Sequence, residues 1–155
     1  MRYLIFFLMA IFVQEEKVYV KNTDALGMLL SEGWMVNGVK TGYWYSYHEN
    51  GRIASKGHYS NDEYDKYWYF YSSEEKLLKE GHFEGGQKNK WWVFYNSDGT
   101  IAHKVQYKNN LKEGYCFQYE NKKITKIEKY KADSKTEEWT DIQSFEKDNS
   151  WRDLR

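Results

Sequence analysis

A 24-residue period runs through most of this sequence, and it constrains the fold more than any other feature does. Tyrosine returns at a fixed phase in four successive units, and glycine and tryptophan return in the first three. Deleting one residue after Tyr119 keeps the fourth unit in register. The clearest columns are Gly33/Gly57/Gly81/Val105, Tyr43/Tyr67/Trp91/Tyr115, Trp44/Trp68/Trp92/Cys116, Tyr45/Tyr69/Val93/Phe117 and Tyr47/Tyr71/Tyr95/Tyr119. The units are therefore 33–56, 57–80, 81–104 and 105–127, as in a stacked repeat protein.

Turn-forming dipeptides punctuate each unit twice. One set, able to adopt the positive φ of two-residue hairpin turns, is Asn37-Gly38, Asn61-Asp62, Gly85-Gly86 and Asn109-Asn110. The second set, half a unit later, is Asn50-Gly51, Glu74-Glu75, Asp98-Gly99 and Asn121-Lys122. Between the turns aromatic residues step by two, as in Tyr43, Tyr45 and Tyr47, which fits a strand and not a helix. Each unit is therefore predicted to supply two antiparallel strands.

Aromatic side chains must build the interior of such a fold. The 7 Trp, 15 Tyr and 8 Phe outnumber Leu, Ile and Val combined, which reverses the usual composition of a globular core. We therefore predict an all-β protein: an elongated single-sheet antiparallel β-meander of repeated hairpins over residues 17–130, with roughly nine or ten strands. We favour a two-residue turn at Asn50-Gly51, which would place Trp44 opposite Gly57, with its ring over bare backbone. The alternative is a bulged turn, which would shift that pairing.

Both ends of the array are expected to carry caps. Residues 17–32 resemble half a unit, because 27–33 align with 51–57 at the same 24-residue spacing, and the ends of a stacked array need cover. The period ends in 131–155. There Ser134-x-x-Glu137 fits a capping box, while Trp139, Ile142 and Phe145 step by three. We predict a short helix over the last strand, with a polar tail as the alternative.

The first full unit reads Gly33-x-Met35-x-Asn37-Gly38-x-Lys40-x-Gly42-x-Trp44-x-x-Tyr47-x-x-Asn50-Gly51-x-Ile53. This pattern, repeated over about 28–130, resembles the divergent bacterial form of the MORN repeat, which is found in proteins labelled YwqK-type antitoxins. The resemblance implies an elongated, twisted sheet of hairpins that serves as a scaffold for protein or lipid contacts. The chain departs from the pattern at Glu74-Glu75 and at Cys116.

Residues 91–102 read Trp91-Trp92-Val93-Phe94-Tyr95-Asn96-Ser97-Asp98-Gly99-Thr100-Ile101-Ala102. This stretch is similar to the hairpin of choline-binding and related cell-wall-binding repeats. In those repeats tryptophan and tyrosine rings of adjacent hairpins cage a quaternary amine by cation–π attraction. The resemblance is clear in one unit only, and the 24-residue period favours the MORN-like interpretation.

The amino terminus has the plan of a secretory signal peptide. Met1-Arg2 precedes an apolar run, Tyr3–Val13, which stops at Gln14. A helix of that length cannot cross a hydrocarbon layer about 30 Å thick. We therefore expect residues 1–13 to be a signal peptide and the protein to be exported, whether periplasmic, cell-surface or secreted. A buried first strand is the alternative.

Charge and reactive side chains argue against several function classes. The 23 Lys+Arg balance 23 Asp+Glu, so neither nucleic acid nor an anionic membrane is the default partner. Cys116 is the single cysteine, and the four histidines lack metal-site spacing. We therefore predict no catalytic residue, no metal site, no cofactor and no enzyme.

A binding surface remains as the expected function. Side chains alternate along a strand, so the tyrosine columns share one face of the sheet and the tryptophans occupy the other. The candidate binding residues are Tyr43, Trp44, Tyr67, Trp68, Trp91, Trp92 and Tyr115. We predict a protein-binding or scaffold module of the cell envelope. The alternatives are a choline-type or other cell-wall ligand, a membrane lipid, or an antitoxin-like partner protein; the oligomeric state stays open.

Overall fold

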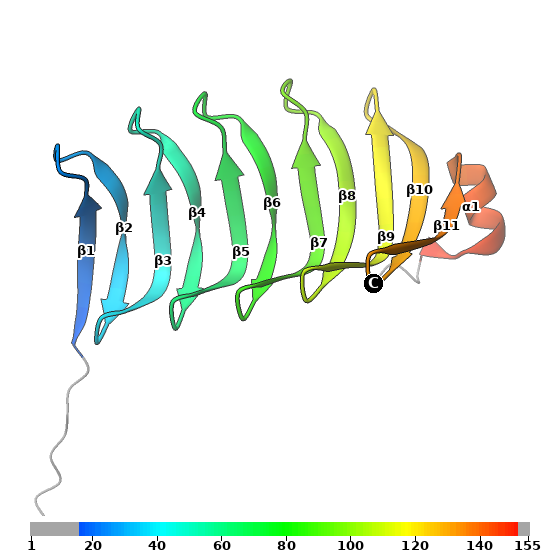
Figure 1. Ribbon diagram of the computed structural model, residues 1–155. Coiled ribbons are helices and arrows are strands. Elements are labelled where there is room, and N and C mark those ends of the chain that lie inside the picture. Colours follow the sequence, from blue (N-terminus) through cyan, green and yellow to red (C-terminus); the bar gives the residue numbers. More distant parts are fainter. Residues whose placement is uncertain (1–15, 152–155) are drawn as a thin grey trace, which may run out of the picture.

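The protein forms one open antiparallel sheet in which strands pair only with their neighbours in sequence (Figure 1). The computed structural model describes residues 16–151. The eleven strands and one helix are β1 (Lys17–Thr23), β2 (Leu29–Val36), β3 (Val39–Tyr47), β4 (Ile53–Ser60), β5 (Glu63–Tyr71), β6 (Leu77–Glu84), β7 (Gln87–Tyr95), β8 (Ile101–Lys108), β9 (Leu111–Glu120), β10 (Lys123–Lys131), β11 (Ser134–Trp139) and α1 (Ile142–Asp148). The predicted meander of hairpins is confirmed.

Two kinds of turn alternate along the chain. At one end of the sheet, two-residue turns join β2–β3, β4–β5, β6–β7 and β8–β9, and both central residues have positive φ, as in Asn61 and Asp62. At the other end the links span five residues, 48–52, 72–76 and 96–100. The backbone N–H of His48 donates to the carbonyl of Arg52 at 2.8 Å and closes the first of these links. The prediction of a two-residue turn at Asn50-Gly51 is therefore wrong.

The fourth unit is one residue shorter because its second turn is different. Asn121 and Lys122, both with positive φ, form a two-residue turn between β9 and β10. Tyr119 therefore pairs with Ile124, whereas Tyr47 of the first unit pairs with Ile53. The deletion needed to align the fourth unit thus removes one residue of a longer turn and leaves the strands in phase.

The rings of Trp44, Trp68 and Trp92 each lie against a glycine of the preceding strand. Trp44 does pair with Gly57, because the register shifts between Ser46 and Tyr47, but its ring covers Gly33. A Cβ on Gly33 would stand 2.3 Å from the Trp44 ring, and Gly57 and Gly81 are equally close to the rings of the next two tryptophans. The expectation that the Trp44 ring covers Gly57 is wrong: register sets the pairing, whereas the side-chain rotamer sets which neighbour is covered.

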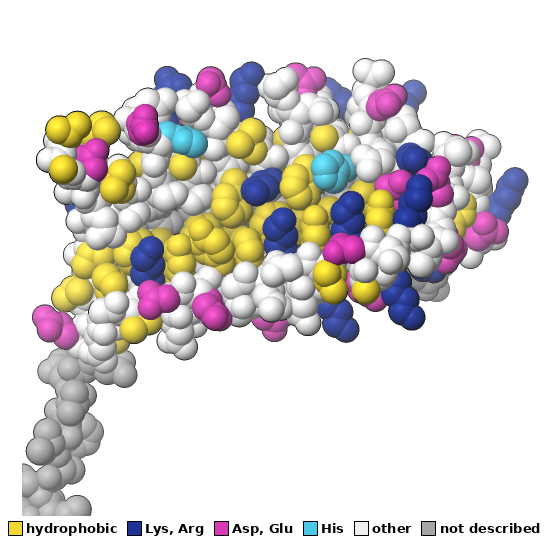
Figure 2. All heavy atoms as spheres, viewed as in Figure 1, with side chains coloured by type: hydrophobic (Ala, Val, Ile, Leu, Met, Phe, Trp, Pro, Cys, Tyr) yellow, Lys and Arg dark blue, Asp and Glu magenta, His cyan; other side chains and the backbone are white. Residues whose placement is uncertain are grey.

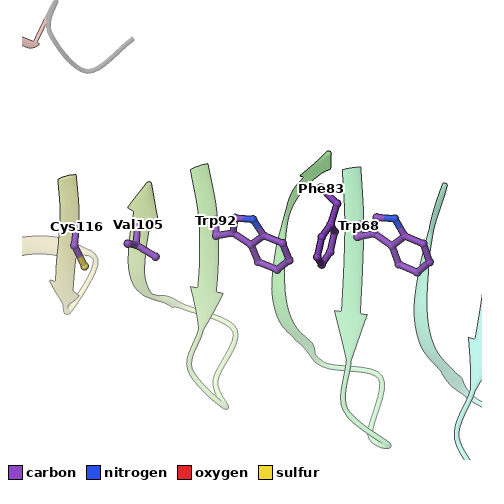
Figure 3. Close-up of a cluster of buried hydrophobic side chains, with 5 residues drawn as sticks. All are labelled: Trp68, Phe83, Trp92, Val105 and Cys116. Carbon is purple, nitrogen blue, oxygen red and sulfur yellow. The ribbon is translucent and has the colours of Figure 1, made fainter. Parts of the chain in front are cut away.

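The face with Trp44, Trp68, Trp92 and Cys116, here called the tryptophan face, holds the main core. A buried cluster runs along it from Trp68 to Cys116, with Phe83 between the two indole rings (Figure 3). Lysine side chains lie over these rings: the Lys40 Nζ is 4.6 Å from the Trp44 ring centroid. Figure 2 shows a band of hydrophobic side chains that crosses the strands and carries basic side chains on its surface.

The C-terminal segment adds a strand before its helix. Residues 134–139 form β11, and Asp141 caps α1 by accepting a bond from the backbone N–H of Ser144 at 2.6 Å. The short helix is confirmed, but Ser134-x-x-Glu137 is not its capping box. Ala132 and Asp133 have positive φ and form one more two-residue turn, which continues the meander past residue 130.

A bulge in β5 and β7 forces lysine into a glycine conformation. Gly42 in the first unit and Gly114 in the fourth occupy the same position of the repeat. In the two middle units this position is Lys66 and Lys90, each with φ of 60°. A left-handed φ strains a residue with a Cβ by about 1–2 kcal/mol.

We expect Lys66→Gly to raise the unfolding free energy by about 0.5–1 kcal/mol in chemical denaturation. Lys108→Gly, at an ordinary strand position, should instead lower it by a similar amount; equal effects would contradict the strain argument.

The predicted signal peptide, residues 1–13, lies outside the described residues. Within residues 16–151, no helix is long and apolar enough to span a membrane.

Candidate binding surface

The seven predicted binding residues divide between two faces of the sheet. Trp44, Trp68 and Trp92 lie on the tryptophan face, as the alternation of side chains requires. The opposite face, here called the tyrosine face, carries the columns Tyr43/Tyr67/Trp91/Tyr115, Tyr45/Tyr69/Val93/Phe117 and Tyr47/Tyr71/Tyr95/Tyr119. No single partner surface can therefore include all seven residues.

The three tryptophans are enclosed by their own chain. Trp44, Trp68 and Trp92 are 1%, 2% and 0% exposed. Each indole Nε1–H donates to a backbone carbonyl ten residues earlier, as from Trp68 to His58 at 2.8 Å. The Nζ atoms of Lys40 and Lys88 lie over the Trp44 and Trp92 rings. The cation–π position that a quaternary amine would need is thus occupied by lysine in two of the three units.

The tyrosine face is held rigid by bonds from its hydroxyl groups to acidic side chains. Tyr47 donates to the Glu32 Oε1 at 2.5 Å, and Tyr95 donates to the Glu80 Oε1 at 2.6 Å. In the unit between them the Lys56 Nζ lies 5.4 Å from the ring centroids of Tyr69 and Tyr71. The rings of Tyr47 and Tyr95 are therefore held in place before any partner arrives.

The Tyr47–Glu32 bond shifts the pKa of both of its partners. Burial, together with the bond to Glu32, raises the pKa of Tyr47 above its ordinary value. The bond from Tyr47 lowers the pKa of Glu32. Burial and the charge of Glu80 raise the pKa of Tyr67 to about 12. At neutral pH Tyr47 is consequently a neutral phenol bonded to the ionised carboxylate of Glu32.

The charged residues of this face were missed in the sequence, although they share the period. Glu32, Lys56, Glu80 and Lys104 stand 24 residues apart, one position before each unit begins. They lie in the same row of the sheet as the Tyr45/Tyr69/Val93/Phe117 column, since Lys56 pairs with Tyr45 and Tyr69. Acidic and basic groups thus alternate from unit to unit along the tyrosine face.

Two histidines of the tyrosine face predict a dependence of stability on pH. His58 and His82 pack edge-on against Tyr43 and Tyr67, with ring centroids 4.9 and 4.8 Å apart. Burial lowers the pKa of both, so below about pH 6.5 the unfolded chain binds protons that the folded chain does not. We therefore expect the guanidinium concentration at the unfolding midpoint to decrease as the pH is lowered from about 7.5 to about 5.5. The double variant His58→Gln/His82→Gln should flatten the change; an unaltered slope would contradict this assignment.

The C-terminal helix covers one end of the tyrosine face. Phe145 of α1 is fully buried against Tyr115, Phe117 and Trp139, at centroid distances of 5.6, 6.5 and 5.2 Å. Tyr115, a predicted binding residue, is 7% exposed as a result. The part of the face over β3, β5 and β7 has no such cover within residues 16–151. We call this part, with Tyr43, Tyr45, Tyr67, Tyr69 and Trp91, the open tyrosine face.

The reactive side chains of the described chain do not converge. Cys116 is 2% exposed, and burial raises the pKa of its thiol to about 11, so little thiolate forms at neutral pH. His103 stacks on Phe94 on the tryptophan face, with ring centroids 4.4 Å apart, away from His58 and His82. In residues 16–151, no three His, Cys, Asp or Glu side chains are grouped as a metal would need.

No family model matches the chain, and no curated protein matches it either.

Proposed function

We propose that this chain is a non-enzymatic scaffold of the cell envelope, and that another protein binds its open tyrosine face. The observation that carries the proposal is the preordering of this surface by the Tyr47–Glu32 and Tyr95–Glu80 bonds. Rigid tyrosine and tryptophan rings offer a large contact area and lose little conformational entropy when a partner binds. The enclosed tryptophans serve stability in this proposal, and the tyrosine rings serve recognition.

The architecture and the sequence pattern also support a relationship to the divergent bacterial MORN repeats. A sheet of successive hairpins is what that resemblance implies, and three of the four units carry a glycine–tryptophan pair. The envelope location rests on the pattern of residues 1–13.

Affinity capture from envelope extracts tests the proposed function. The bait is the full chain, compared with a Tyr43→Ser/Tyr69→Ser variant on the open tyrosine face. Lys79→Ser, whose Nζ lies 4.9 Å from the Phe70 ring centroid on the tryptophan face, is the control. We expect a saturable partner that the double variant loses and the control retains, with all three chains equally folded by circular dichroism. Calorimetric binding of choline with no captured protein would overturn the proposal.

Export has its own test. If residues 1–13 are a signal peptide, the native protein should begin near Gln14 and fractionate outside the cytoplasm. N-terminal sequencing of protein purified from each cell fraction measures this. An intact Met1 in the cytosolic fraction would contradict export and would leave the binding surface unaffected.

A further inference from the structure

One hollow on the tyrosine face interrupts the repeat. It has a volume of about 390 Å³, within the range of small-ligand sites. Its lining residues are Trp91, Val93, Lys104, Phe117, Tyr119, Ile124 and Trp151. It lies where the open tyrosine face meets the part covered by the C-terminal segment.

The hollow exists because one ring of the ladder is missing. The column that holds Tyr45, Tyr69 and Phe117 has Val93 in the third unit. Val93 pairs with Glu80 on one side and Lys104 on the other, so the strands themselves keep the same register. The missing ring leaves a space lined by aromatic faces.

The rings around this space are arranged to receive another ring. Trp91 stacks on Phe117 with an interplanar angle of 16° and centroids 5.3 Å apart. Trp151 packs 6.1 Å from Phe117, while remaining 42% exposed, and its Nε1–H donates to Glu146 at 2.6 Å. A planar group that enters between these side chains can make offset or edge contacts with several of them.

Lys104 brings a positive charge to the edge of this hollow. Its Nζ lies 6.0 Å from the Tyr119 ring centroid, and within residues 16–151 it forms no ion pair. Lys56, at the same phase of another unit, instead lies closer to two tyrosine rings, at 5.4 Å from each. A half-buried ammonium group beside an apolar hollow favours an anionic ligand and disfavours a quaternary amine.

We propose that this hollow binds an aromatic side chain of a protein partner that is flanked by a carboxylate, with the ring on Trp91 and Phe117 and the carboxylate on Lys104. The proposal rests on the proposed function and names the recognition element of the partner. In this proposal the gap at Val93 and the charge of Lys104 determine which partner side chains are recognised. The tyrosines of the open tyrosine face add contact area with less specificity.

The test uses the full chain and a capped Asp-Phe-Asp peptide. We expect saturable shifts of the Trp91 and Trp151 indole N–H signals in NMR titration, with a dissociation constant of about 1 mM or tighter. Val93→Tyr restores the missing ring and should weaken binding at least about tenfold. Because tyrosine already occupies this column in two other units, the variant should keep or raise the melting temperature.

Two further arms test the charge. The Lys104→Gln variant should bind Asp-Phe-Asp only as tightly as the parent protein binds an Asn-Phe-Asn peptide. The Lys56→Gln variant should bind Asp-Phe-Asp as tightly as the parent does. No shifts at about 10 mM peptide, equal binding of the two peptides, or full binding by folded Val93→Tyr would each overturn the assignment. The result can be distinguished from failure of the proposed scaffold function. A partner that Val93→Tyr retains but Tyr43→Ser/Tyr69→Ser loses would support the scaffold function and refute the binding role of the hollow.

Discussion

Replacing Gly57 with alanine should destabilise the protein by about 3 kcal/mol or more, although it adds one methyl group. The new Cβ would stand 2.3 Å from Cδ2 of Trp68, a separation that side chains do not adopt. Either the Trp68 ring or the backbone of β4 must move. A displaced ring would also lose its bond to the carbonyl of His58, at 2.8 Å.

Gly51→Ala is the matched control for this substitution. Gly51 has φ of 79°, and no atom lies within 4 Å of the position that an added methyl group would take, so alanine there meets backbone strain alone. We expect a loss of about 1 kcal/mol for the control, which would lower the melting temperature by about 2–4 °C. Thermal and guanidinium unfolding of both variants provide the comparison. Equal losses would mean that the ring does not need a bare backbone beneath it.

Cys116→Trp and Val105→Gly should each destabilise the protein, and their combination should restore it. In three units a glycine lies beneath a tryptophan; in the fourth, Val105 and Cys116 occupy the two positions, 1% and 2% exposed. A tryptophan at 116 would collide with the valine side chain, at a cost of about 3 kcal/mol. A glycine at 105 would leave a cavity under the cysteine, at a cost of about 2–4 kcal/mol.

The double variant Val105→Gly/Cys116→Trp recreates the pair found in the other units. We expect its unfolding free energy to lie within about 1 kcal/mol of the parent, which gives a coupling energy of several kcal/mol in a double-mutant cycle. In the other units the indole donates to the residue ten positions earlier, so the new one would point at the carbonyl of Gln106. Additive losses in the cycle would show that Val105 and Cys116 are not a substitute for the glycine–tryptophan pair.

The sheet could be predicted from sequence because its signals are local and repeated. Alternation at Tyr43, Tyr45 and Tyr47 assigns strand and face together, and a dipeptide such as Asn61-Asp62 assigns the turn. The direction of the Trp44 ring could not be predicted, since pairing with Gly57 is compatible with a ring on either neighbouring strand. Rotamers depend on the packed surroundings, which no column of the repeat encodes.

The wrong assignment at the C-terminal end had a signal in the sequence. Ser134-x-x-Glu137 satisfies the capping-box pattern, but Ala132-Asp133 lies 23 residues after Asn109-Asn110, the length of the shortened fourth unit. Extending the period once more would have predicted β11. The hollow at Val93 shows the converse limit: the missing ring is visible in the sequence, whereas the wall supplied by Trp151 depends on where α1 packs.

Each strand pairs only with the strands next to it in the sequence, and this affects how the chain folds. Every hairpin closes a short loop, so little chain entropy is lost before each new contact forms, and assembly can proceed hairpin by hairpin from several starting points. The two ends then differ in cooperativity. The α1 end ties β9, β10 and β11 together through Phe145, whereas the outer edge of β1 has no neighbour within residues 16–151. Local opening should therefore be easiest at β1 and hardest near α1, which makes the molecule a graded array and not a single all-or-none unit.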